Sequence, residues 1–160
     1  MSQHKQDEYT RWGLLGVIPL LVAAVAVWLS PLILPQHIAL DFAWGALIYL
    51  GVIIGFLSGV GAGLELHPQN SFRTFLPYTI TILAVVILLL PSGVFIFATP
   101  MAWRFVGVIV LLLYILMRDV NATAQSQAPG WYGPLRIRLT FWAGMSATMI
   151  AIRLAFWRFY

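Results

Sequence analysis

Apolar runs of about 18 residues or more occupy most of this sequence, and runs of that length mark helices that cross a lipid bilayer. Of the 160 residues, 61% are hydrophobic and only 9% are charged. A soluble domain carries about 25% charged residues, so this chain has too few polar groups to cover a surface that faces water. We therefore expect an all-α integral membrane protein, and we exclude a soluble enzyme, a disordered protein and a coiled coil.

Prolines, charges and polar loops divide the apolar sequence into five predicted spans. These spans form a single domain over residues 1–160 and cover residues 12–30, 40–64, 72–90, 100–118 and 139–156. Pro31 ends the first span, because proline cannot continue a helix. Asp41 lies near the start of the second span, where its carboxylate can accept hydrogen bonds from the free backbone N–H groups of the helix. A polar loop from Asp119 to Gly130 is expected before the last span.

The start of the fourth span depends on Arg104. Only 13 residues, none of them charged, separate Arg104 from Arg118. They make about 20 Å of helix, too short for a hydrocarbon core of about 30 Å, so the span must include Arg104. A start at Pro100 puts Arg104 one turn inside, where its side chain can snorkel to the interface. A start just after Pro91 would bury it near the midplane at a cost of at least about 3 kcal/mol, so we favour the first.

The basic residues predict how the chain is oriented. Five spans put the termini on opposite sides of the membrane. The side with the N-terminus holds Lys5, Arg11, Arg73, Arg118, Arg136 and Arg138, and the other side holds Arg104, Arg153 and Arg158. Positive charge is retained in the cytoplasm, so we expect a multi-pass protein of the bacterial inner membrane with a cytoplasmic N-terminus and an outside C-terminus. Acidic residues before the first span argue against a cleaved targeting peptide.

Small residues repeat at intervals of four on two of the predicted spans. The second span carries Gly51, Gly55, Gly59 and Gly63, and the last span carries Ala143, Ala147, Ala151 and Ala155. Residues four apart lie on nearly one helix face, so each set predicts a bare groove into which another helix packs, in the manner of a glycine zipper. The alternative for the glycines is a path for a small solute.

Polar residues that could carry chemistry are few. Glu65 and His67 suggest a metal pair or a proton relay, but two ligands are too few for a structural zinc site. We favour an ion pair between Glu65 and Arg73, Arg136 or Arg138. The chain has no cysteine and no paired-histidine motif, so we expect no metal, no cofactor and no catalytic residue. Glu65 and Arg104 remain the candidate polar groups within the membrane.

One segment combines interfacial aromatic residues with cations. Trp131, Tyr132, Arg136 and Arg138 precede the last predicted span. Two guanidinium groups near the headgroups can bind a lipid phosphate or the carboxylate of a partner. We expect these residues to anchor the topology or to contact lipid or a partner. The net charge of +4 indicates orientation and contact with anionic lipid, and no basic run or RNA-binding motif points to nucleic acid. The small-residue faces add other integral membrane subunits as expected partners.

Three features resemble a known family. The stretch from Phe56 to Gly63 is similar to the F-L-G-G-hydrophobic-x-W-G stretch of bacterial relatives of mitochondrial transmembrane protein 69. The pair Trp131-Tyr132 followed by Leu135-Arg136, and Asp119 after the fourth span, are the other matches. This sequence departs from the pattern in two places: small residues occupy positions 61 and 62, and residues 92–98 resemble an insertion. The resemblance covers nearly the whole chain and implies a small multi-pass protein of bacterial or mitochondrial inner membranes, with no particular activity.

These observations favour a role without catalysis. Two small-residue faces, little mass outside the membrane and no reaction centre predict an accessory or assembly subunit of a larger inner-membrane complex, in the first place a respiratory one. The alternative is a small transporter or channel, which would need paired or water-facing polar groups at midplane depth.

Overall fold

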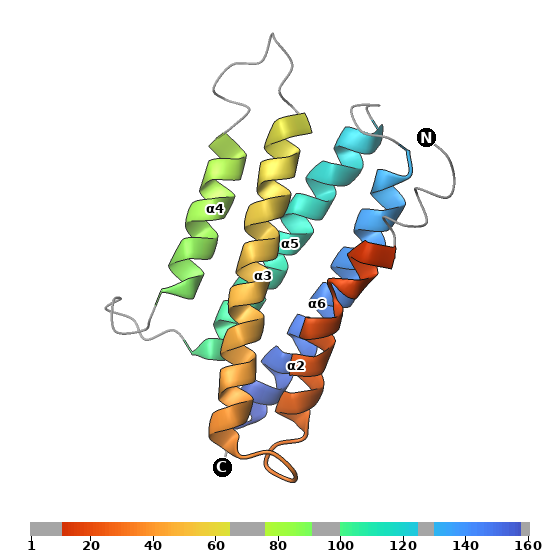
Figure 1. The fold of residues 1–160 in the computed structure, drawn as a ribbon. Helices are drawn as coiled ribbons and strands as arrows, with labels where there is room; N and C mark the ends of the chain where they lie inside the picture. Colours follow the sequence, from red (N-terminus) through yellow and green to blue (C-terminus); the bar gives the residue numbers. More distant parts are fainter. Residues whose placement is uncertain (1–10, 65–75, 91–99, 125–129, 158–160) are drawn as a thin grey trace.

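The computed structural model describes residues 11–64, 76–90, 100–124 and 130–157. The described residues form helices and no strand. The helices are α2 (Ile18–Trp28), α3 (Gln36–Leu64), α4 (Leu76–Leu89), α5 (Met101–Ala124) and α6 (Tyr132–Phe156). A helical turn over residues 11–15 precedes α2. Successive helices run in opposite directions along one bundle axis (Figure 1).

Prolines mark where several of these helices begin. Pro19, Pro77 and Pro134 each lie in the first turn of a helix, where the missing N–H would have no partner within the helix. Pro31 lies between α2 and α3, and Pro100 directly precedes α5. Each proline in the described part of the chain therefore starts or separates helices, and none of these interrupts the middle of one.

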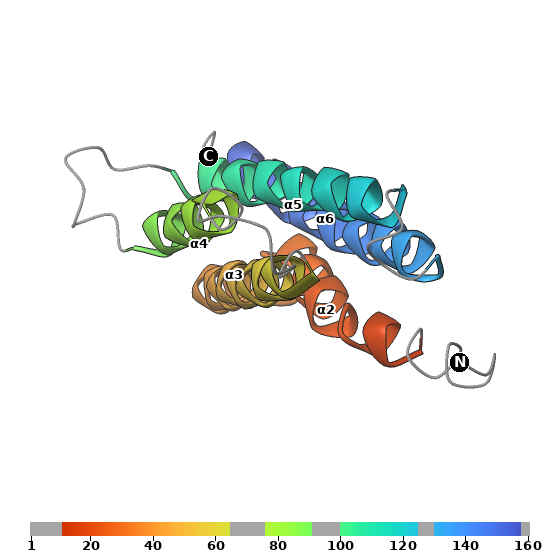
Figure 2. The ribbon, with the colours of Figure 1, turned by 90° about the horizontal axis from the view of Figure 1, so that it is seen from above.

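The bundle is two layers thick when it is seen from above. Figure 2 shows α2 and α3 on one side and α5 and α6 on the other, with α4 next to α3 and α5. The core between the layers is built from large apolar side chains: Leu20, Val27, Leu47, Leu50, Ile54, Phe105, Val108 and Ile150. Large apolar side chains also cover the outside of the bundle, as a surface that faces lipid requires.

Among the described residues, four helices are long and apolar enough to cross a membrane. They are Arg11–Trp28, Gln36–Gly63, Met101–Ala124 and Tyr132–Phe156. Leu76–Leu89 is a shorter apolar helix of 14 residues, about 21 Å long. These helices confirm the predicted all-helical architecture with several apolar helices.

Three helix boundaries differ from the predicted spans. The loop expected from Asp119 is wrong, because α5 continues to Ala124. The last helix begins at Tyr132 instead of residue 139, and α3 begins at Gln36 instead of residue 40. In each case the prediction stopped at charged or polar residues. Such residues end the stretch that can lie in hydrocarbon. They do not end a helix, which continues as long as its backbone hydrogen bonds do.

Candidate functional site

The predicted glycine groove is only partly a packing face within this chain. A Cβ atom added at Gly51 would lie 2.7 Å from Leu89 Cδ1. The absence of a side chain at Gly51 therefore allows α4 to pack closely against α3. Nothing lies within 4 Å of a Cβ added at Gly55, Gly59 or Gly63, and Gly59 and Gly63 are exposed. An interval of four turns about 40° beyond a full rotation, so over three intervals the glycines drift about 120° around the helix. Of the four glycines, Gly51 therefore packs against another helix of this chain, and the packing of a helix against the other three stays a prediction.

Other small residues lie where helices of this chain approach each other. Ala143, Ala147 and Ala151 are buried in the core, whereas Ala155 is exposed. Gly61 also admits a neighbour: a Cβ atom there would lie 2.6 Å from Cε1 of Tyr78 on α4. Nothing in the spacing of the four-residue repeat indicated Gly61.

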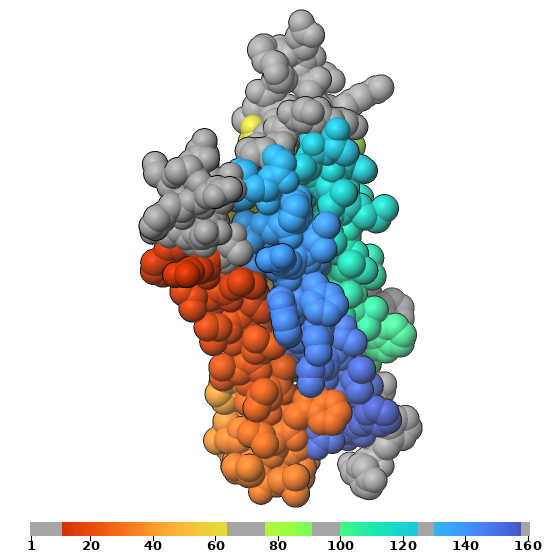
Figure 3. Space-filling view, turned by 90° about the vertical axis from the view of Figure 1, so that its right-hand side faces the viewer, coloured from red at the N-terminus to blue at the C-terminus, as the bar shows by residue number. Residues whose placement is uncertain are grey.

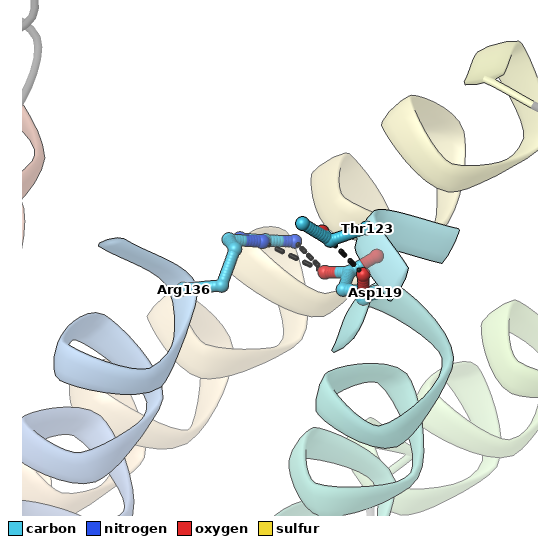
Figure 4. A network of polar contacts seen from close by, with 3 residues as sticks. All are labelled: Asp119, Thr123 and Arg136. Carbon is cyan, nitrogen blue, oxygen red and sulfur yellow. Dashed lines mark hydrogen bonds and ion pairs between the residues drawn. The ribbon is translucent and has the colours of Figure 1, made fainter. Parts of the chain in front are cut away.

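A buried ion pair joins α5 to α6 at the upper end of the bundle in Figure 1, where α3 and α5 end and α4 and α6 begin. Arg136 Nε donates a hydrogen bond of 2.7 Å to Asp119 Oδ2, and Nη2 lies 2.7 Å from the same oxygen (Figure 4). The two side chains are only 7% and 5% exposed. One turn beyond Asp119, the Thr123 hydroxyl donates to the Asp119 carbonyl oxygen at 2.9 Å.

This pair corrects the role predicted for Arg136. Its guanidinium was expected to contact lipid or a partner, but it is buried against Asp119 and lies 5.3 Å from the ring centre of Tyr132. The helix that carries it begins seven residues earlier than predicted, which moves Arg136 from the loop into the bundle. Trp131 and Tyr132 are half-buried, and Arg138 is exposed. Glu65, His67 and Arg73 lie outside the described residues.

Arg104 caps the C-terminal end of α4 at the lower end of the bundle. Its Nη1 donates to the carbonyl oxygens of Leu88, at 3.2 Å, and Leu90, at 2.6 Å. The guanidinium lies 5.3 Å from the ring centre of Trp44 on α3. The last carbonyls of a helix have no partner in that helix and carry partial negative charge, so a cation satisfies them well. Arg104 does lie one turn inside α5, but it turns into the bundle and is 3% exposed, so its predicted snorkelling to the interface is wrong.

Arg153 makes a similar contact with α2. Its Nη2 donates to the Ser30 carbonyl oxygen, just beyond the end of α2. Its guanidinium lies 5.8 Å from the ring centre of Trp28 and 5.3 Å from that of Trp157. Trp28 Nε1 in turn donates to the Met149 carbonyl oxygen at 3.1 Å. The sequence analysis assigned Arg153 only to the topology, because its partner is 123 residues away along the chain.

A fourth arginine completes the pattern. Arg118 on α5 lies 4.4 Å from the ring centre of Tyr78 on α4. Each of the four arginines thus contacts an aromatic ring and connects helices, Arg118 and Arg136 near the upper end of the bundle and Arg104 and Arg153 near the lower end. The described part of the chain brings together no group of three or more His, Cys, Asp or Glu residues that could hold a metal.

A pocket of about 260 Å³ lies among residues 12–17, which precede α2, and the helices α3, α5 and α6. Its polar lining comes from Arg136, Thr140 and Tyr49, and the Tyr49 hydroxyl donates to the Gly16 carbonyl oxygen at 2.7 Å. The remaining lining is apolar side chains and the glycines at positions 13 and 16. The ion pair of Arg136 therefore borders a pocket that is partly open to the outside, since the exposed Trp12 and Phe56 also line it, and the charge of Arg136 is compensated by Asp119.

Apolar helices, an apolar exterior and arginines that join helices near both ends define a multi-pass helical membrane protein. Residues 6–152 match the family model described as "Protein of unknown function (DUF3429)", so the chain belongs to this family. Comparison with curated proteins and with solved structures found no match.

Proposed function

We propose that this protein is a non-catalytic accessory or assembly subunit of a larger membrane complex. The observation that carries the proposal is the unoccupied glycine face of α3. Gly55, Gly59 and Gly63 have open space where a side chain would lie, although they belong to an apolar helix long enough to cross a membrane. Glycine lowers the stability of a helix, and contact with lipid does not offset this cost. Contact with a second helix can offset it, because glycine allows the two backbones to approach closely.

The polar contacts support the same proposal. The buried charged side chains among the described residues are Arg104, Asp119 and Arg136, and each already has a partner within the chain. Their contacts connect helices, which is a structural task. Along the described helices, the surface that a partner helix would meet consists of small and apolar residues.

We place the protein in the bacterial inner membrane with the upper end of the bundle in the cytoplasm. Arg11 and Arg138 are exposed at that end, and positive charge favours the cytoplasmic side. The resemblance of three short stretches to bacterial relatives of mitochondrial transmembrane protein 69 supports an inner-membrane location. Among the complexes of that membrane, we propose a respiratory complex as the partner.

A small transporter or channel is the second candidate. The observation in its favour is the pocket of about 260 Å³ that Arg136 lines, because transporters place polar groups beside internal space. Arg136 is neutralised by Asp119, and a solute that accepts hydrogen bonds would have to compete with that carboxylate.

Purification from the native membrane distinguishes the two candidates. The chain, with a tag at its N-terminus, is extracted in a mild detergent and its particle is sized and identified by mass spectrometry. A subunit is recovered in a particle much larger than its own micelle, and its deletion lowers the amount of that complex. A stable monomer or small homo-oligomer that carries out solute flux in liposomes would contradict the subunit role and support the transporter.

A further inference from the structure

An apolar groove runs along the outside of the bundle between α2 and α6. It has a volume of about 590 Å³, and Leu14, Ile18, Leu21 and Trp142 contribute to its walls. Arg11 lines it at its upper end. The groove follows the helical turn that carries Arg11 and continues along the first turn of α2 to Leu21. Figure 3 shows this face, with α2 in red and orange beside α6 in blue.

A second cation lies at the same level as Arg11. A Cβ atom added at Gly13 would lie 3.3 Å from Leu139 Cδ1, so the turn that carries Arg11 packs against α6 at Leu139. Arg138 is the residue before Leu139, and Trp142 follows Arg138 by four positions, on the same side of the helix. Arg11 and Arg138 therefore flank the upper part of one seam, and Trp142 lies one turn deeper.

No anion of the described residues compensates these two arginines. Both are exposed. Of the two described aspartates, Asp119 is buried against Arg136, and Asp41 lies near the start of α3, at the opposite end of the bundle. The seam thus combines two exposed positive charges at the upper end of the bundle with an apolar groove that continues below them.

We propose that this groove is a binding site for an anionic phospholipid. The phosphate lies between Arg11 and Arg138, and one acyl chain follows the groove along Leu14, Ile18 and Leu21 against Trp142. Charge complementarity selects this ligand, because an anionic head above an apolar chain matches a cationic rim above an apolar groove. The site is independent of the proposed subunit role, since it uses α2 and α6 and not the glycine face of α3.

Native mass spectrometry of the delipidated protein tests the site. Phosphatidylglycerol and phosphatidylcholine of identical acyl chains are titrated separately. We expect phosphatidylglycerol to bind more tightly. Arg11→Gln and Arg138→Gln should each weaken its binding about five-fold, the usual effect of one cation near an anionic surface. Ile18→Trp, which fills the groove without a change in charge, should also weaken it.

Two matched variants separate a built site from general attraction. Arg118→Gln removes the same charge at the same end, but beside Tyr78 on α4, away from the groove. Ile80→Trp adds the same ring at an exposed position of α4. We expect both controls to bind phosphatidylglycerol as the parent protein does. Equal binding of the two lipids, or equal losses for Arg118→Gln and Arg138→Gln, would overturn the proposal. So would a crosslink from position 18 to a protein helix in the native membrane.

Discussion

Arg136 places two nitrogens on a single carboxylate oxygen of Asp119, and the pair is buried where α5 ends and α6 begins. Two ions that are removed from water must satisfy each other, and the attraction repays their desolvation only when both are present. The pair therefore adds one specific polar contact to the apolar packing of α5 against α6.

The first prediction concerns this pair. Arg136→Ala or Asp119→Ala alone leaves a buried charge without a partner, and each should lower the free energy of unfolding by about 3–5 kcal/mol. Arg136→Met combined with Asp119→Leu should recover most of that loss, because no charge is then buried. Thermal unfolding in detergent measures the effect. Arg138→Ala serves as the control and should change stability by less than about 0.5 kcal/mol, since that side chain is exposed. Equal losses in all variants would show that the pair is not what joins the helices.

The second prediction concerns Arg104. Arg104→Leu removes the guanidinium and leaves the carbonyl oxygens of Leu88 and Leu90 without their donor, and each unsatisfied buried group costs about 1–3 kcal/mol. Stability should fall, and the end of α4 should become more accessible. A cysteine introduced at Leu90 in this cysteine-free chain should then react faster with a water-soluble maleimide. Trp103→Leu, an exposed neighbour on α5, should leave that rate unchanged.

The sequence predicted the architecture well and the arginine contacts poorly. Long apolar runs and prolines determine where helices can cross a membrane, so the number of apolar helices follows from local information. The end of α5 and the start of α6 do not follow from local information. There the helices extend beyond the apolar stretch, and Asp119 and Arg136 stabilise each other in these extensions. Their separation of 17 residues gives no local signal of a contact.

The glycines show a second limit of local patterns. An interval of four suggests one face, but the drift of the helix carries Gly59 away from the face that Gly51 presents to α4. Gly61, outside the repeat, contacts Tyr78 instead. Which glycine packs depends on where the neighbouring helix lies, and that is a property of the whole bundle.

The third prediction concerns orientation. Gln36 and Ala124 are exposed at opposite ends of the bundle. In intact cells, a cysteine at Gln36 should react with an impermeant reagent from outside, and a cysteine at Ala124 should react only after the membrane is opened. The reverse pattern would place the cationic end outside and contradict the charge argument.

The fourth prediction compares two glycines on one helix. Gly61→Ala puts a methyl group 2.6 Å from the ring of Tyr78, and such overpacking should cost about 1–3 kcal/mol. Gly59→Ala meets nothing and should leave the stability of the isolated chain unchanged or slightly increased, because alanine favours the helix. Thermal unfolding of the purified variants measures both. A similar loss in both variants would mean that Gly59 packs within the chain.

The last prediction uses the same glycine to test the subunit role. Gly59→Leu should leave the isolated chain folded, because the added side chain enters open space, yet it should separate the backbone of α3 from a partner helix. We therefore expect a variant with parental thermal stability that no longer copurifies in the large particle. Val52→Leu, at an exposed position two turns earlier on α3, is the matched control and should stay in the particle. Retention of Gly59→Leu in the complex would show that the open glycine face is covered by lipid and not by a partner, and the main argument for a subunit would then be lost.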